Sequence, residues 1–108
     1  MLIIGEKINA TRKQIAAALK DRDAEMIAQT AKEQAEAGAD YIDVNGGDPN
    51  AERETENVAW LVELVQANTD VPVAVDTASV TAARKGLSMA KGRPILNSIS
   101  LEGERPER

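Results

Sequence analysis

Residues 40–49 read DYIDVNGGDP, and the fold depends on how this stretch is interpreted. Residues 40–45 have the composition of a short strand, and the Gly-Gly-Asp-Pro that follows at 46–49 is typical of a loop. Upstream, apolar residues recur at helical spacing and stop at Gly38. Downstream, helical spacing resumes near Glu52. A strand between two helices is the unit from which parallel α/β sheets are built.

The same alternation runs through the rest of the chain. Short apolar strands are expected at residues 2–4, 73–75 and 94–96. Helices are expected after Thr11, which stands in a capping box with Gln14, after a cap at Asp21 or Asp23, from about Glu52 to Asn68, and from Ser79 to about Lys91. On the last helix, the positions expected to face the core are Val80, Ala83, Leu87 and Ala90. Four strands alternating with helices predict an α/β protein with a parallel sheet.

Every expected strand delivers polar residues at its carboxyl end. These are Glu6 and Asn9, Asp43 and Asn45, Asp76, and Asn97. Polar residues from four consecutive strands fit the mouth of a (β/α)8 barrel, where a site is assembled from many strand ends. An open doubly wound sheet usually gathers its ligand contacts at one switch point, and no Gly-x-Gly-x-x-Gly loop is present. We therefore predict the N-terminal half of a TIM barrel, with residues 1–108 forming its first four β/α units.

Composition excludes several classes of function. The formal net charge is −5 and no cluster of basic residues appears, which argues against nucleic-acid binding. The chain has no Cys and no His, so no disulfide, thiolate or imidazole chemistry is expected and no metal site is predicted. No apolar run approaches the roughly 20 residues of a membrane helix, and the expected location is the cytoplasm.

Length conflicts with a closed barrel. A complete barrel of this kind takes about 250 residues, whereas this sequence has 108. Four strands alone would leave an open edge on each side and an uncovered inner face. The expectation is therefore that the chain is a fragment of a longer barrel, or that copies pair as a homo-oligomer to cover those edges.

Four motifs together resemble a known family. They are GEKIN at residues 5–9, the DVNGG segment at 43–47, Asp76-Thr77, and ILNS at 95–98. In this order they are similar to the pterin-binding family of methyltetrahydrofolate methyltransferases. That family includes the enzyme that methylates the corrinoid/iron-sulfur protein and the folate-binding module of cobalamin-dependent methionine synthase. The resemblance covers essentially the whole chain.

The resemblance implies a role for each polar strand end. Glu6 and Asn9 would lie beside the pterin ring, and Asp76 would accept hydrogen bonds from its aminopyrimidine edge. Asn97 would hold the ring near its carbonyl and reactive nitrogens, and with Asp76 it would form the catalytic pair. Supporting positions at the rim would be Asp43 and Asn45.

The implied reaction is transfer of the N5-methyl group of methyltetrahydrofolate to the Co(I) of a corrinoid on a partner protein. N5 must be protonated or strongly hydrogen-bonded, because an amide anion is a poor leaving group. Folate is then a substrate, cobalamin belongs to the partner, and this chain binds no metal itself.

Other interpretations remain open. Asp76 could simply cap the following helix, Asn9 and Asn97 could be ordinary turn residues, and Glu6 could be a solvated strand end. A dihydropteroate synthase-like enzyme would share the pterin pocket, although Gly46-Gly47-Asp48-Pro49 lacks the Ser-Thr-Arg sequence usual in those enzymes. A non-catalytic half-barrel that only binds a ligand or assembles is the remaining alternative.

Overall fold

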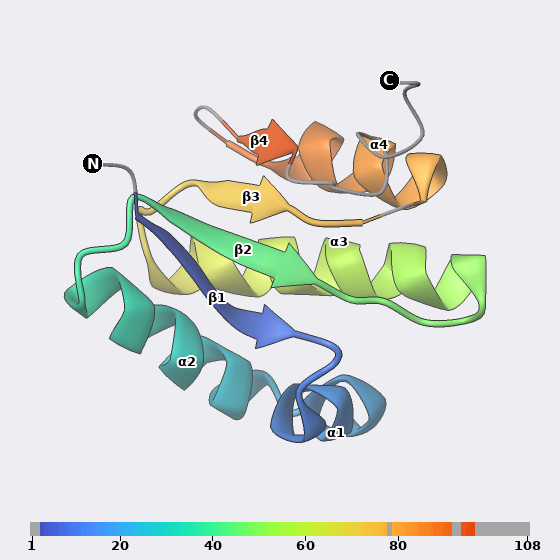
Figure 1. Ribbon diagram of the computed structural model, residues 1–108, viewed down its shortest axis with the longest axis horizontal. Coiled ribbons are helices and arrows are strands. Elements are labelled where there is room, and N and C mark those ends of the chain that lie inside the picture. Colours follow the sequence, from blue (N-terminus) through green and yellow to red (C-terminus); the bar gives the residue numbers. More distant parts are fainter. Residues whose placement is uncertain (1–2, 78, 92–93, 97–108) are drawn as a thin grey trace.

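The computed structural model describes residues 3–77, 79–91 and 94–96. Strands and helices alternate along the chain (Figure 1). The elements are β1 (Ile4–Asn9), α1 (Lys13–Asp21), α2 (Ala24–Glu36), β2 (Tyr41–Asn45), α3 (Ala51–Asn68), β3 (Val73–Val75), α4 (Val80–Met89) and β4 (Ile95–Leu96). The α/β class predicted from the sequence is confirmed, as are the two helices, α1 and α2, that were expected between the first two strands.

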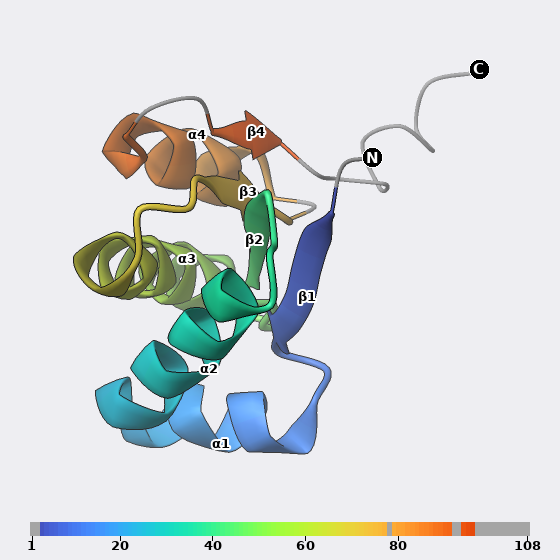
Figure 2. The same cartoon turned by 90° about the vertical axis from the view of Figure 1, so that its left-hand side faces the viewer.

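The strands form one parallel sheet in the order β1-β2-β3-β4. Figure 2 shows the described helices gathered on one face of this sheet, with the opposite face bearing no helix. Sequential order and a single covering layer are what a barrel wall requires, because a barrel keeps its helices outside. An open doubly wound sheet would place helices on both faces.

Side chains alternate between the two faces of the sheet, as the pleat requires. Residues on the helix side are aliphatic and fully buried, namely Ile8, Ile42, Val44, Val73 and Val75. They pack against the apolar stripes of α2 and α3, including Ile27, Leu61 and Val65. The hydrophobic core therefore lies entirely between the sheet and the helices.

Three of the helix starts are capped by side chains. Asp23 Oδ1 accepts from Met26 N at 3.2 Å, Asn50 Oδ1 from Arg53 N at 3.0 Å, and Ser79 Oγ from Ala82 N at 3.2 Å. Each of these bonds satisfies a backbone donor that the first helical turn leaves without a partner. The caps expected at Asp23 and Ser79 are confirmed, as is the stop after α2, where Gly38 adopts φ of +94°.

Three local expectations are wrong. The first strand was expected at residues 2–4, but β1 covers Ile4–Asn9 and continues through Gly5 and Glu6. Thr11 does not cap α1, because the helix begins after Arg12, which makes no side-chain cap. On α4 only Val80 is misplaced, since it is 55% exposed, whereas Ala83 is buried and Leu87 and Ala90 pack against the core as expected. Residues two apart on a helix point to nearly opposite sides, so the burial of Ala82 turns Val80 toward solvent.

Within the described ranges, no helix is long and apolar enough to cross a membrane.

Candidate functional site

The carboxyl ends of β2 and β3 bring Asn45 and Asp76 into direct contact. Asn45 Nδ2 donates to Asp76 Oδ2 at 3.3 Å. The Asn45 amide cannot be turned around without cost, because its oxygen accepts from the backbone N–H of Gly47 at 3.0 Å. Asn45 therefore presents its NH2 group to Asp76 and fixes the position of that carboxylate.

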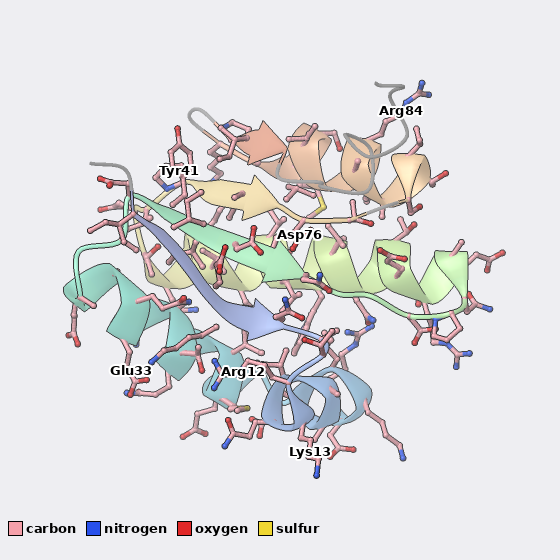
Figure 3. All side chains as sticks on the ribbon, in the orientation of Figure 1. Arg12, Lys13, Glu33, Tyr41, Asp76 and Arg84 are labelled. Atoms are coloured by element: carbon pink, nitrogen blue, oxygen red, sulfur yellow. The ribbon has the colours of Figure 1, made fainter. Side chains whose placement is uncertain are left out.

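Asp76 is half-buried and lies just beyond β3, at the opposite end of the sheet from Tyr41 (Figure 3). Its backbone N–H donates to Val44 O at 3.0 Å, which extends the β2–β3 pairing by one residue. The following helix is capped by Ser79 and not by Asp76. The interpretation of Asp76 as a simple cap is therefore wrong, and its carboxylate belongs to the rim of the sheet.

Asn9 lies next to Asn45, because the two residues are register partners at the ends of β1 and β2. Its side-chain oxygen accepts from Thr11 N at 2.8 Å and from Thr11 Oγ1 at 2.7 Å. The turn interpretation of Asn9 is thus correct for the oxygen. Any contact with a ligand must come from the amide nitrogen.

The remaining candidates differ in their placement. Asp43 is 2% exposed and shares a sheet face with Tyr41 and Asn45, opposite the helices. Glu6 is exposed on β1, in the segment where the register with β2 shifts between Gly5 and Ile8. No hydrogen bond among the described residues links Glu6 to the Asn45–Asp76 pair. Asn97 lies outside the described residues.

Two polar residues of α3 contact the rim loops and were not singled out in the sequence. Asn57 is buried, and its Nδ2 donates to Gly46 O at 3.0 Å. Glu54 Oε2 accepts a short hydrogen bond from the hydroxyl of Thr77, which is 3% exposed. The available signal was the polar Asn57 directly before the apolar run that starts at Val58, a position where a helix already faces its core.

A cavity of about 480 Å³ adjoins the rim on its helix side, between α1 and the start of α3. Ala10 and Gly47 line it at the rim, and its charged walls carry both signs, from Lys20, Arg22, Arg53, Asp48 and Glu56. None of the candidate residues that the structure describes lines this cavity. The Arg22 guanidinium lies over the Trp60 ring, 4.9 Å from its centroid, and Trp60 packs against the core.

Among the described residues, no group of three or more His, Cys, Asp or Glu side chains is placed to hold a metal ion. The described rim offers hydrogen bonding by a carboxylate and neighbouring amides. Such a set recognises flat heterocycles that carry adjacent N–H donors.

Comparison with known proteins gives the same answer as the motifs. Residues 5–108 match the family described as pterin binding enzyme. The chain is similar to a methylcorrinoid:tetrahydrofolate methyltransferase of Eubacterium limosum, with 34% identity over 105 residues. This match covers 97% of the chain and 38% of the relative, so the chain spans less than two fifths of that protein's length. The chain therefore belongs to the pterin-binding family that its motifs resemble.

Proposed function

We propose that this chain supplies the first part of the pterin site of a methyltransferase that exchanges a methyl group between a tetrahydrofolate and a corrinoid protein. The observation that carries the proposal is the Asn45–Asp76 contact at the ends of adjacent parallel strands. This contact orients the Asp76 carboxylate before any ligand binds. Preorganisation of this kind lowers the cost of binding.

Asp76 has the capacity to recognise a pterin edge. An ionised carboxylate has about four lone-pair sites, and Asn45 takes one of those on Oδ2. The ring N–H and exocyclic amine of a pterin lie side by side and match a bidentate carboxylate. Asn9 and Asp43 flank this position from β1 and β2, and the proposal gives them supporting roles together with Glu6.

The transfer is a nucleophilic displacement that balances in both directions. When methyltetrahydrofolate is the donor, an electron pair on Co(I) forms the new bond to carbon and the N5–C electrons remain on N5. A proton supplied to N5 makes the folate a neutral leaving group. The name of the relative places the methyl group on the corrinoid at the start. The same site serves that direction because a catalyst lowers one barrier for both.

Asn97 completes the proposed catalytic pair with Asp76. It follows directly after the last residue of β4, which pairs in parallel with β3. An amide at that place in the sequence would both donate and accept at the pterin carbonyl and reactive nitrogen.

The proposal also includes the architecture. Residues 1–108 would form the first four β/α units of a TIM barrel, with the polar strand ends at its mouth. Support comes from the sequential parallel order and from the helices lying on one face (Figure 2). Catalytic residues of TIM barrels lie at the carboxyl ends of the strands, which is where Asn45 and Asp76 are found.

The test is calorimetric titration of 5-methyltetrahydrofolate into the chain and into its Asp76→Asn variant. The substitution preserves shape but replaces one acceptor oxygen by an NH2 donor that would face the donor groups of the pterin, so we expect affinity to fall at least about tenfold. Asp70→Asn is the matched control, because Asp70 is exposed at the other end of β3. Equal affinity in Asp76→Asn and wild type, or no binding by wild type, would overturn the pterin assignment.

Transfer itself is measured in a chimera in which this chain replaces the aligned 105 residues of the E. limosum relative. We expect methyl exchange with a Co(I) corrinoid, followed by its absorbance, and loss of that exchange with Asp76→Asn. A chimera that is folded by circular dichroism and binds methyltetrahydrofolate, but transfers no methyl group, would contradict the methyltransferase proposal and favour a synthase or a binding module.

A further inference from the structure

Helix α3 contacts both of the loops that carry the Asn45–Asp76 pair. Asn57 donates to the carbonyl of Gly46, in the loop after β2, at 3.0 Å. Glu54 accepts from the hydroxyl of Thr77, in the loop after β3. Residues three apart on a helix lie on the same side, so one turn of α3 holds two neighbouring strand ends.

The contact with Gly46 leaves no room for adjustment. A Cβ atom added at Gly46 would lie 2.5 Å from Asn57 Cβ and 3.1 Å from the backbone of Asn57. Asn57 is only 6% exposed, so the loss of its bond to the Gly46 carbonyl would leave a buried donor and acceptor without each other. The loop after β2 is therefore set at a fixed height above α3.

Both contacts involve a residue that directly follows a member of the Asn45–Asp76 pair in the sequence. Gly46 lies between Asn45 and Gly47, and the Gly47 N–H donates to Asn45 Oδ1 at 3.0 Å. That bond sets the direction in which the Asn45 amide donates to Asp76. On the other strand, Thr77 directly follows Asp76.

The Thr77 hydroxyl is used twice, since it donates to Glu54 and accepts from Ser79 N at 3.1 Å. A hydroxyl bonded on both sides has a fixed orientation. The backbone that leaves Asp76 is therefore held between α3 and the start of α4.

We propose that Glu54 and Asn57 are positioning residues, which fix the distance and orientation of Asp76 relative to Asn45 without touching the ligand. The proposal rests on the proposed function for the identity of the ligand, but the clamp itself exists without one. Its role is preorganisation, because a bidentate acceptor recognises adjacent donors only when its position is set within a fraction of an ångström.

The first experiment uses no ligand. In ¹H–¹⁵N spectra of the chain, Glu54→Ala and Thr77→Val should shift the side-chain amide signals of Asn45 and the backbone signals of Asp76 and Ser79. Glu54→Gln and Thr77→Ser should restore the wild-type positions, because an amide oxygen still accepts and serine still donates. Asn45 and Asp76 signals that stay unchanged in Glu54→Ala and Thr77→Val would overturn the clamp.

Glu52→Ala is the matched control. Glu52 and Glu54 are both acidic residues in the first turn of α3, so either substitution removes one favourable charge from the helix N-terminus. Glu54 accepts a hydrogen bond from Thr77 in a rim loop, whereas Glu52 is exposed. Equal spectral changes in the two variants would assign the effect to the helix and contradict the clamp.

The second experiment repeats the 5-methyltetrahydrofolate titration in the same variants. We expect Glu54→Ala and Thr77→Val to bind roughly tenfold more weakly, which corresponds to about 1.4 kcal/mol, with recovery in Glu54→Gln and Thr77→Ser. Recovery by the conservative variants separates positioning from general loss of structure. If Glu54→Ala and Thr77→Val change the spectra but bind 5-methyltetrahydrofolate as tightly as wild type does, the positioning role is wrong. If the wild-type chain binds no folate, the proposed function is wrong, and the spectral test of the clamp still stands.

Discussion

The helix-facing side of the sheet and its opposite side are stabilised by different physical effects. On the helix side, aliphatic residues such as Ile42 and Val75 are fully buried against α2, α3 and α4. At the rim of the opposite side, Asn45 and Asp76 are held by directional hydrogen bonds. Burial of apolar surface is roughly proportional to area and tolerates small shifts, whereas hydrogen bonds fix distances.

Consecutive residues of β2 illustrate the difference. Asp43 and Val44 are 2% and 0% exposed, yet one side chain is a polar carboxyl group and the other is aliphatic. They are neighbours in sequence but point to opposite faces of the sheet. Burial alone therefore does not decide which residue type is accepted at a position, because the chemistry of the face does.

The largest loss of stability is expected when a carboxylate is placed on the helix-facing side of the sheet. Val44→Asp would bury a carboxylate in the hydrophobic core cluster that also contains Ile8, Val58 and Val62. An uncompensated buried charge should cost more than about 4 kcal/mol, which is most of the stability of a small domain. Circular dichroism at 25 °C should show a chain that is largely unfolded.

Val44→Ala is the companion variant, because it removes volume without adding charge. Its expected cost is about 2–3 kcal/mol from lost burial and the residual cavity. If the melting temperature of Val44→Asp lay within a few degrees of that of Val44→Ala, the helix-facing side would accept a carboxylate. The proposed difference between the two faces of the sheet would then be wrong.

Patterns in the sequence predicted the elements of the fold well. Helix α3 ends at Asn68, before Pro72, and β3 covers Val73–Val75 as expected. These features are local, because proline and glycine restrict or release the backbone at their own positions. Helical spacing of apolar residues identifies the face of a long helix for the same reason.

Hydrogen bonds between elements were not predictable in the same way. Nothing near Asn57 or Glu54 in sequence indicates that they reach Gly46 and Thr77, because those contacts depend on how α3 docks on the sheet. The failed cap at Thr11 has a related cause, since its hydroxyl donates to Asn9 instead of accepting from the helix. Side chains of this type bond to whichever backbone or side-chain partner the tertiary fold brings near.

A smaller effect is expected where α4 approaches the helix-facing side most closely. A Cβ atom at Gly86 would lie 2.8 Å from Val58 Cγ1 and 3.1 Å from Val75 Cγ1. Overpacking costs about 1–3 kcal/mol, and the higher helix propensity of alanine returns about 1 kcal/mol, so we expect Gly86→Ala to lose about 1 kcal/mol. Urea unfolding measures this difference.

Ser88→Ala serves as its control, because Ser88 is exposed on the same helix. Its stability should stay within about 0.5 kcal/mol of wild type. A gain in stability for Gly86→Ala would mean that α4 can move away from the sheet, and that packing on the helix-facing side is less tight than the distances indicate.

The smallest effect is expected outside both faces, at the surface ion pair of the β2–α3 loop. Arg53 Nε lies 3.5 Å from Asp48 Oδ1, and the Arg53 side chain is 66% exposed. Solvent screens such a pair, so Arg53→Ala should change the free energy of unfolding by less than about 0.5 kcal/mol, and by still less in 1 M salt.

The adjacent cap Asn50→Ala should cost about 1 kcal/mol, because it leaves the Arg53 N–H without its acceptor in either salt condition. If Arg53→Ala cost as much stability as Asn50→Ala, and still did so in high salt, the ion pair and not the cap would fix the start of α3. The ion pair would then also fix the turn of α3 that carries Glu54 and Asn57.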